Sequence, residues 1–158
     1  MRLSKNFSLH EFTRSQTAER FGIDMTASDG VIDNLRRLVT GCLQPLRDEA
    51  GPINISSGFR PLELNTRIGG SKTSAHILGS AADFTVTRMT PFEVCELVVT
   101  MELPFDQIIH EFGVWSHLGV ADILRGEQLT AYRNDGKVRY THGIIRIEDG
   151  ILRLEDFQ

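Results

Sequence analysis

The chain has 158 residues, a length that suits one domain and is too short for two of ordinary size. Its apolar fraction of 41% and charged fraction of 24% are ordinary for a globular protein, and the net charge of −4 argues against nucleic acid as a main partner. No stretch is apolar for long enough to span a bilayer, and the first residues lack the apolar core of a secretory signal. We therefore expect a protein made in the cytoplasm, without a membrane anchor.

Two helices are predicted in the N-terminal third. Ser8 and Glu11 form a capping box that predicts a short helix, and His10 falls in its exposed first turn. The longest helix is capped by Ser28 or Thr26, and apolar residues follow at helical spacing over four turns. Pro45 lies inside this helix and predicts a bend, because its ring clashes with the carbonyl four residues earlier.

The middle of the chain alternates short strands and helices. Strands are predicted at residues 53–57 and again in the AADFTV run after Gly79, and a short helix at residues 61–67 lies between them. Thr90 and Glu93 form a second capping box, which begins the next helix. Cys42 and Cys95 fall on separate apolar helical faces, so we expect buried free thiols.

Two hairpins are predicted in the last third. The first covers residues 105–120, and the second turns at Asn134-Asp135-Gly136 between strands of about 130–133 and 138–141. Weak alternation over residues 144–154 allows one more strand. This order of elements predicts an α+β fold, with a small, mostly antiparallel sheet and helices packed on one side.

Three side chains are candidate metal ligands. His76 is predicted on a loop and Asp83 on a strand, where small Ala81 shares its face while Ala82 and Phe84 face the other way. A catalytic zinc site keeps three protein ligands and one open position, and the best third candidate is His117. Two imidazoles and one carboxylate around one zinc ion would lower the pKa of a bound water toward neutrality.

Three sequence segments carry a family resemblance. In order, SGFRP, SAHILGSAADF and WSHLGV resemble the zinc D-Ala-D-Ala metallopeptidases that cut bacterial peptidoglycan, in the lysostaphin-type, D-Ala-D-Ala and hedgehog-like group. The pattern Ser-x-His-x-x-Gly-x-Ala-x-Asp is complete at Ser74, His76, Gly79, Ala81 and Asp83. The resemblance spans roughly residues 3–120, is closest to small phage and prophage versions, and implies their fold.

Residues near these ligands are candidates for binding substrate. Arg60 follows a predicted strand, and the resemblance implies that its guanidinium binds substrate. Ser74 could hold a ligand, polarise the scissile carbonyl or make a loop hydrogen bond. Trp115 could pack the hairpin or form a wall of the site.

The general base depends on the register of the hairpin at residues 105–120. A two-residue turn at Gly113-Val114 would pair His110 with His117, whereas a wider turn including Trp115 would pair Glu111 with His117. The residues alone leave both open. The resemblance favours Glu111, because several relatives carry a glutamate six residues before the last histidine ligand.

These observations lead to a functional hypothesis. We expect one domain over residues 1–158, with a family-like core at 1–122 and a hairpin extension at 123–158. We expect a monomeric zinc endopeptidase acting on the stem peptides of peptidoglycan, of the kind that a phage releases to lyse cells. A D-Ala-D-Ala carboxypeptidase, and a zinc-binding module without hydrolytic activity, are the alternatives.

Overall fold

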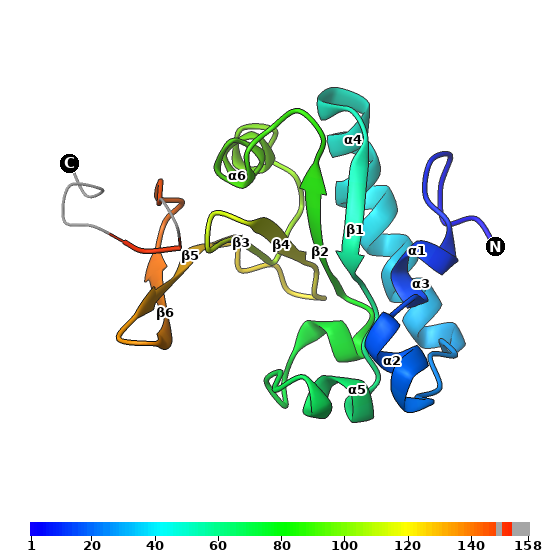
Figure 1. Ribbon diagram of the computed structural model, residues 1–158. Helices are drawn as coiled ribbons and strands as arrows, with labels where there is room; N and C mark the ends of the chain where they lie inside the picture. Colours follow the sequence, from blue (N-terminus) through cyan, green and yellow to red (C-terminus); the bar gives the residue numbers. More distant parts are fainter. Residues whose placement is uncertain (148–149, 153–158) are drawn as a thin grey trace.

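A six-stranded sheet runs through the centre of the protein, in a computed structural model that describes residues 1–147 and 150–152 (Figure 1). The strand order is β1-β2-β4-β3-β5-β6, and all neighbours are antiparallel except the parallel pair β3 and β5. The predicted α+β fold with a mostly antiparallel sheet is confirmed. The strands are β1 Ile53–Ser57, β2 Ala81–Val86, β3 Gln107–Glu111, β4 Trp115–Gly119, β5 Glu127–Asn134 and β6 Lys137–His142.

Three of the helices, α1, α3 and α6, begin where the sequence predicts caps. The Ser8 N–H donates to Glu11 at 2.8 Å, and the Thr90 N–H donates to Glu93 at 2.8 Å, as expected for capping boxes. Ser28, and not Thr26, caps the longest helix, because its Oγ accepts from a backbone N–H three residues later at 3.3 Å. The helical elements are α1 Leu9–Thr13, α2 Gln16–Phe21, α3 Asp29–Leu38, η1 Val39–Leu43, α4 Gln44–Ala50, α5 Leu62–Arg67, η2 Ala75–Leu78 and α6 Pro91–Thr100.

The predicted long helix is irregular just before Pro45. The run from α3 to α4 is interrupted by η1, a single π-helical segment that ends just before the proline. Proline has no backbone N–H to donate, and a π-helical turn accommodates this missing hydrogen bond within a helix. The helical run therefore continues past the proline, and its apolar side chains stay on the side that faces the sheet.

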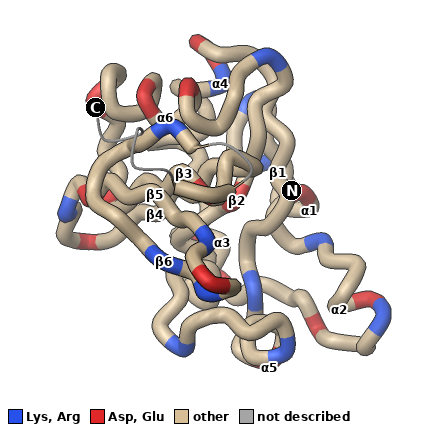
Figure 2. The backbone as a smooth tube through the Cα atoms, turned by 60° about the vertical axis from the view of Figure 1, so that its left-hand side comes forward, with Lys and Arg blue, Asp and Glu red and all other residues tan. Residues whose placement is uncertain are grey.

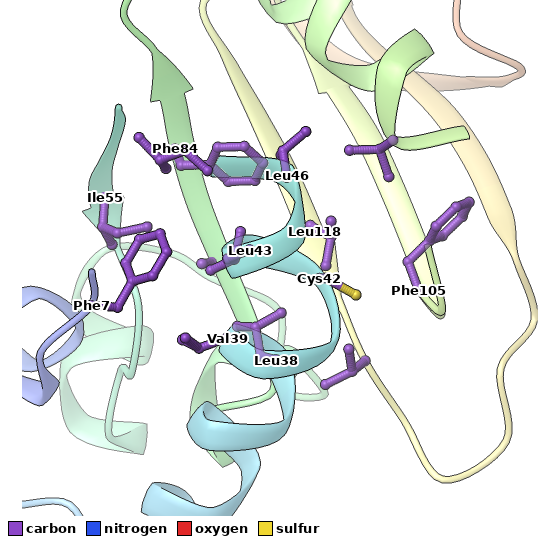
Figure 3. Packing of buried hydrophobic residues seen from close by; sticks show 14 of the residues in the cluster. Phe7, Leu38, Val39, Cys42, Leu43, Leu46, Ile55, Phe84, Phe105 and Leu118 are labelled. Atoms are coloured by element: carbon purple, nitrogen blue, oxygen red, sulfur yellow. The ribbon is translucent and has the colours of Figure 1, made fainter. Parts of the chain in front are cut away.

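The hydrophobic core lies between this helical run and one face of the sheet (Figure 3). Leu38, Leu43 and Leu46 of the helices pack there with Phe84 of β2 and Leu118 of β4, and all five are fully buried. Burying each of these side chains contributes roughly 1.5–3 kcal/mol. Because strand residues alternate between faces, β2 can bury Phe84 in this core while its neighbour Asp83 faces the other side of the sheet.

Both cysteines are buried free thiols, as predicted. Cys42 lies in η1 and Cys95 in α6, and burial raises the pKa of each thiol to about 12. The two side chains therefore act as small apolar groups of the core, with little thiolate at neutral pH.

The predicted C-terminal hairpin is present, but the strand allowed after it is not found where the chain is described. Asp135 and Gly136 form its two-residue turn with φ values of 50° and 72°, the left-handed geometry that an Asp-Gly turn favours. Residues 144–147 form no strand, and residues 148–149 and 153–154 of that prediction lie outside the described residues. Basic and acidic residues are interspersed along the fold (Figure 2). Of the helices described, none is both long and apolar enough to cross a bilayer.

Candidate metal centre

Three predicted ligands come together on the face of the sheet opposite the core. One ligand atom from each of His76, Asp83 and His117 lies within 4.8 Å of the others, a grouping that could hold a metal ion. Asp83 of β2 and His117 of β4 are direct cross-strand partners, which places their side chains side by side. The His117 Nδ1 lies 2.8 Å from Asp83 Oδ1, and the His76 Nε2 lies 3.3 Å from the same oxygen.

The loop geometry fixes the orientation of His76. The Ser74 Oγ accepts from the His76 N–H at 3.3 Å and begins η2, which ends at Gly79 in the left-handed conformation with φ of 70°. A Cβ at Gly79 would lie 2.7 Å from the side chain of Val31, so only glycine lets this turn approach α3. The His76 Nδ1 donates to the Gly58 carbonyl at 2.7 Å. This bond leaves the lone pair on Nε2, and such a hydrogen bond typically supports a metal-ligating histidine.

The protonation states suit a cation site. Burial alone would raise the pKa of Asp83, but the hydrogen bond from His117 and the contact with His76 outweigh it and hold the pKa below its usual value. Burial lowers the pKa of His76, which favours a neutral imidazole. The His76 Nε2 is buried and has no hydrogen-bond partner among the described residues. An ionised carboxylate beside this lone pair and a second imidazole is a donor set that zinc uses in catalytic sites.

The β3–β4 hairpin has neither of the two predicted registers. Its connection is Phe112–Val114, so Glu111 pairs with Trp115, and Ile109 pairs with His117. Phe112 takes the left-handed conformation with φ of 58°, which is uncommon for a bulky residue. Its N–H donates to a carbonyl of β5 at 3.0 Å, and this tertiary bond supports the turn.

The observed register places Glu111 beside the metal-binding group. Glu111 and His117 share a face of the sheet as diagonal neighbours, and Glu111 Oε1 lies 3.9 Å from His117 Nδ1. Burial raises the pKa of Glu111 to about 7, and the negative charge of Asp83 acts in the same direction. His110 lies on the opposite face, where its Nδ1 donates to the Ile145 carbonyl at 2.8 Å. His110 therefore lies across the sheet from the metal-binding group and cannot act as the base.

A cleft of about 700 Å³ lies over this group and is also lined by the predicted substrate-binding residues Arg60, Ser74 and Trp115. The Arg60 N–H donates to the His76 carbonyl at 3.0 Å, which ties the arginine to the loop that carries the ligand. Burial lowers the pKa of Arg60, while the charges of Asp83 and Glu111 act in the opposite direction. Arg60 Nε is buried without a partner among the described residues.

Sequence reasoning missed a wall of the cleft. Arg133, Val138 and Tyr140, from β5 and β6, line it together with the ligands. Alternation along the hairpin places these three on one face, but no local signal indicates that β5 pairs in parallel with β3 and so turns this face toward the cleft. The Gly58 carbonyl that orients His76 was also missed, because a backbone acceptor has no signature of its own.

A second hollow adjoins the cleft. It has a volume of about 600 Å³ and lies between the start of α2, the end of β1 and the segment that follows β1. Arg60 and Ile68 line both hollows, so the two hollows are neighbours at these residues.

Comparison with known proteins gives one family match. The model of the family described as peptidase M15 matches residues 5–119, well over half of the chain. The match contains all three candidate ligands, Arg60 and Glu111, and it ends before β5 begins. No curated protein sequence matches the chain significantly.

Proposed function

The chain belongs to the peptidase M15 family, and from this premise we propose that it is a zinc-dependent endopeptidase that cleaves stem peptides of bacterial peptidoglycan. One observation carries the proposal: a largely buried carboxylate, Glu111, lies 3.9 Å from His117 in the same cleft as the group of possible metal ligands. Peptidoglycan as the substrate rests on the resemblance of SGFRP, SAHILGSAADF and WSHLGV to D-Ala-D-Ala metallopeptidases.

His76, Asp83 and His117 would hold one zinc ion. The fit rests on the unpartnered, buried His76 Nε2 and on the ionised state of Asp83. The proton that His117 Nδ1 shares with Asp83 would leave when metal binds, because ligands must be deprotonated. When bound, zinc supplies a Lewis acid that polarises a carbonyl oxygen and acidifies a water.

Glu111 would move the protons of the reaction. Its carboxylate takes a proton from the attacking water as the water oxygen bonds to the carbonyl carbon of the scissile amide. The same carboxyl group then gives the proton to the leaving nitrogen as the carbon–nitrogen bond breaks. A pKa of about 7 suits a group that must both accept and return a proton near neutral pH.

Arg60 would position the substrate. Its guanidinium lines the cleft close enough to Asp83 and Glu111 to be influenced by their charges, and it can offer two parallel N–H donors to a carbonyl or carboxylate. The hydrogen bond from the Arg60 N–H to the His76 carbonyl holds the arginine at a fixed position relative to the metal-binding loop.

The second hollow beside the cleft supports an endopeptidase. An enzyme that removes a terminal residue needs a closed end to recognise the free carboxylate, whereas an endopeptidase must accommodate the chain on both sides of the scissile bond. The second hollow, which shares Arg60 and Ile68 with the cleft, offers space for further residues of such a chain next to the arginine. A D-Ala-D-Ala carboxypeptidase is the second candidate, because Arg60 could instead bind a terminal carboxylate.

We place the protein among the lytic enzymes of phages and prophages, on the resemblance to their small, single-domain members. On this proposal, the protein acts on the wall after release from the cytoplasm.

The proposal is tested on purified peptidoglycan. The protein loaded with one equivalent of zinc is incubated with intact sacculi, and the released fragments are analysed by mass spectrometry. We expect new free amino groups inside stem peptides or cross-bridges, loss of activity with a chelator, and recovery on adding zinc. Release of terminal D-Ala alone would favour the carboxypeptidase. Stoichiometric zinc binding without cleavage would support a silent zinc-binding module and overturn the proposal.

A further inference from the structure

The β5–β6 hairpin extends the floor of the cleft beyond the part of the chain that matches the family. The match ends at residue 119, and β5 begins at Glu127. β5 pairs in parallel with β3, the strand that carries Glu111, and β6 follows as the next strand of the same sheet (Figure 1). Side chains of this hairpin therefore reach the face on which the candidate ligands lie.

The register places Tyr140 in the same row as Glu111. Glu111 pairs with Ala131, and Ala131 pairs with Tyr140, so all three point to one face. Strands lie about 4.8 Å apart, which puts the backbones of Glu111 and Tyr140 about 10 Å apart. The side chain between them, that of Ala131, is only a methyl group. Tyr140 is 57% exposed. Burial and the charges of Glu111 and Asp83 raise the pKa of Tyr140, in keeping with a phenol that faces the same hollow.

The next row adds a cation and an apolar side chain. Arg133 and Val138 are direct cross-strand partners on this face, and both line the cleft. The Arg133 guanidinium lies 4.7 Å from the centre of the ring of Phe112, the first residue of the β3–β4 connection. Among the described residues, no carboxylate lies within 4.0 Å of it. Another cation of the cleft, Arg125, is already paired with Asp106 at 2.7 Å.

We propose that Arg133, Val138 and Tyr140 form a substrate-binding wall for an acidic peptide, which we name the hairpin wall. Arg133 pairs with a carboxylate of the peptide, while Val138 and Tyr140 pack against its small apolar side chains. Charge complementarity supports this occupant, because Arg60 and Arg133 line the cleft on either side of its acidic groups. In the order of the sheet, Arg60 follows β1 and Arg133 lies on β5, and the strands that carry Asp83 and Glu111 lie between them. The inference rests on the proposed function, and it assigns substrate selection to a segment outside the family match.

The test measures binding separately from cleavage. Trp115 is the only tryptophan and lines the cleft, so its fluorescence reports occupancy. Soluble muropeptides with tetrapeptide stems are titrated into the zinc-loaded Glu111→Gln protein, which binds without turnover. The same muropeptides with their carboxylates amidated serve as the neutral probe. Arg133→Ala is compared with Arg139→Ala, a matched control whose side chain leaves β6 on the opposite face.

We expect the free-carboxylate muropeptides to bind about tenfold more tightly than the amidated ones, the usual worth of a partly exposed charge-assisted hydrogen bond. Arg133→Ala should lose this preference, and Arg139→Ala should keep it. In the active background, Arg133→Ala should raise KM about tenfold with kcat within about twofold.

The hairpin wall would be overturned if Arg133→Ala and Arg139→Ala bound each probe with the same affinity. It would also be overturned if no variant bound muropeptides. The two proposals can fail separately. Cleavage of peptidoglycan by the wild type, together with indistinguishable arginine variants, refutes the wall and leaves the peptidase. Preference for carboxylates that depends on Arg133, together with no cleavage by the wild type, refutes the peptidase and leaves the wall.

Discussion

Glu111→Gln should separate catalysis from metal binding and folding. The substitution keeps the shape of a side chain that is 15% exposed and lies 3.9 Å from His117, and it removes the proton acceptor. A positioned acid or base contributes about 10²- to 10⁴-fold, so kcat on peptidoglycan fragments should fall by that factor, or by about 3–5 kcal/mol of transition-state stabilisation. Zinc content, measured by mass spectrometry of the metal, should remain at one equivalent.

The same substitution should stabilise the metal-free protein at high pH. The pKa of Glu111 is raised from 4.5 in the unfolded chain to about 7 in the folded one, because burial disfavours the carboxylate. The folded state therefore binds the proton more tightly, and this contribution to stability is present below pH 4.5 and is lost as pH rises through 7. The loss is worth up to roughly 3 kcal/mol. Glutamine has no such loss, so the variant should exceed the wild type in stability at pH 8, and the difference should narrow toward pH 5.

Urea denaturation in the presence of a chelator, at pH 5 and pH 8, measures the free energy of unfolding of the metal-free protein. Single-turnover cleavage measures the activity. Glu96→Gln, the same chemical change at an exposed position of α6, is the matched control and should alter neither. His110→Ala should cost packing against Phe92 more than activity. Full activity of Glu111→Gln would refute the assignment of the base, and a variant that loses both zinc and activity would make Glu111 a structural residue.

Three further outcomes are expected. His117→Ala should lose most of the bound zinc, and zinc content near one equivalent would show that the third ligand is wrong. Arg60→Ala should keep zinc and thermal stability while losing most of kcat/KM, and Arg60→Lys should recover only part of it, because lysine lacks the bidentate fork; unchanged kinetics would leave Arg60 without a role in binding. Phe84→Ala should lower the free energy of unfolding by about 3–5 kcal/mol, since the ring is fully buried, and a loss below 1 kcal/mol in urea denaturation would contradict the described core.

Local chemistry made much of the candidate site predictable. Ser74, His76, Gly79 and Asp83 lie within ten residues, so a cap, a left-handed glycine and strand alternation suffice to place His76 on a short turn and Asp83 opposite the core. His117 joins them because β2 and β4 are neighbours. The sequence indicated His117 as the third ligand, but it did not indicate that these two strands pair.

The register of the β3–β4 hairpin could not be read from its turn residues. Glycine at position 113 allows several turn lengths, and the observed one needs Phe112 in a left-handed conformation that local propensity disfavours. A hydrogen bond to β5 and the aromatic contact with Trp115 support that conformation. Whether Glu111 or His110 faces the ligands was thus decided by contacts with distant residues.

By itself, the sequence determined most of the helices and strands and the face that β2 buries, because caps, turn residues and alternation act within a few residues of one another. Only the tertiary structure decided which strands are neighbours. The parallel pairing of β3 with β5 joins segments about 20 residues apart and leaves no local signature, since parallel partners need a long connection rather than a tight turn. That pairing turns Tyr140 and Arg133 toward Glu111, so the wall of the cleft exists only in the folded chain.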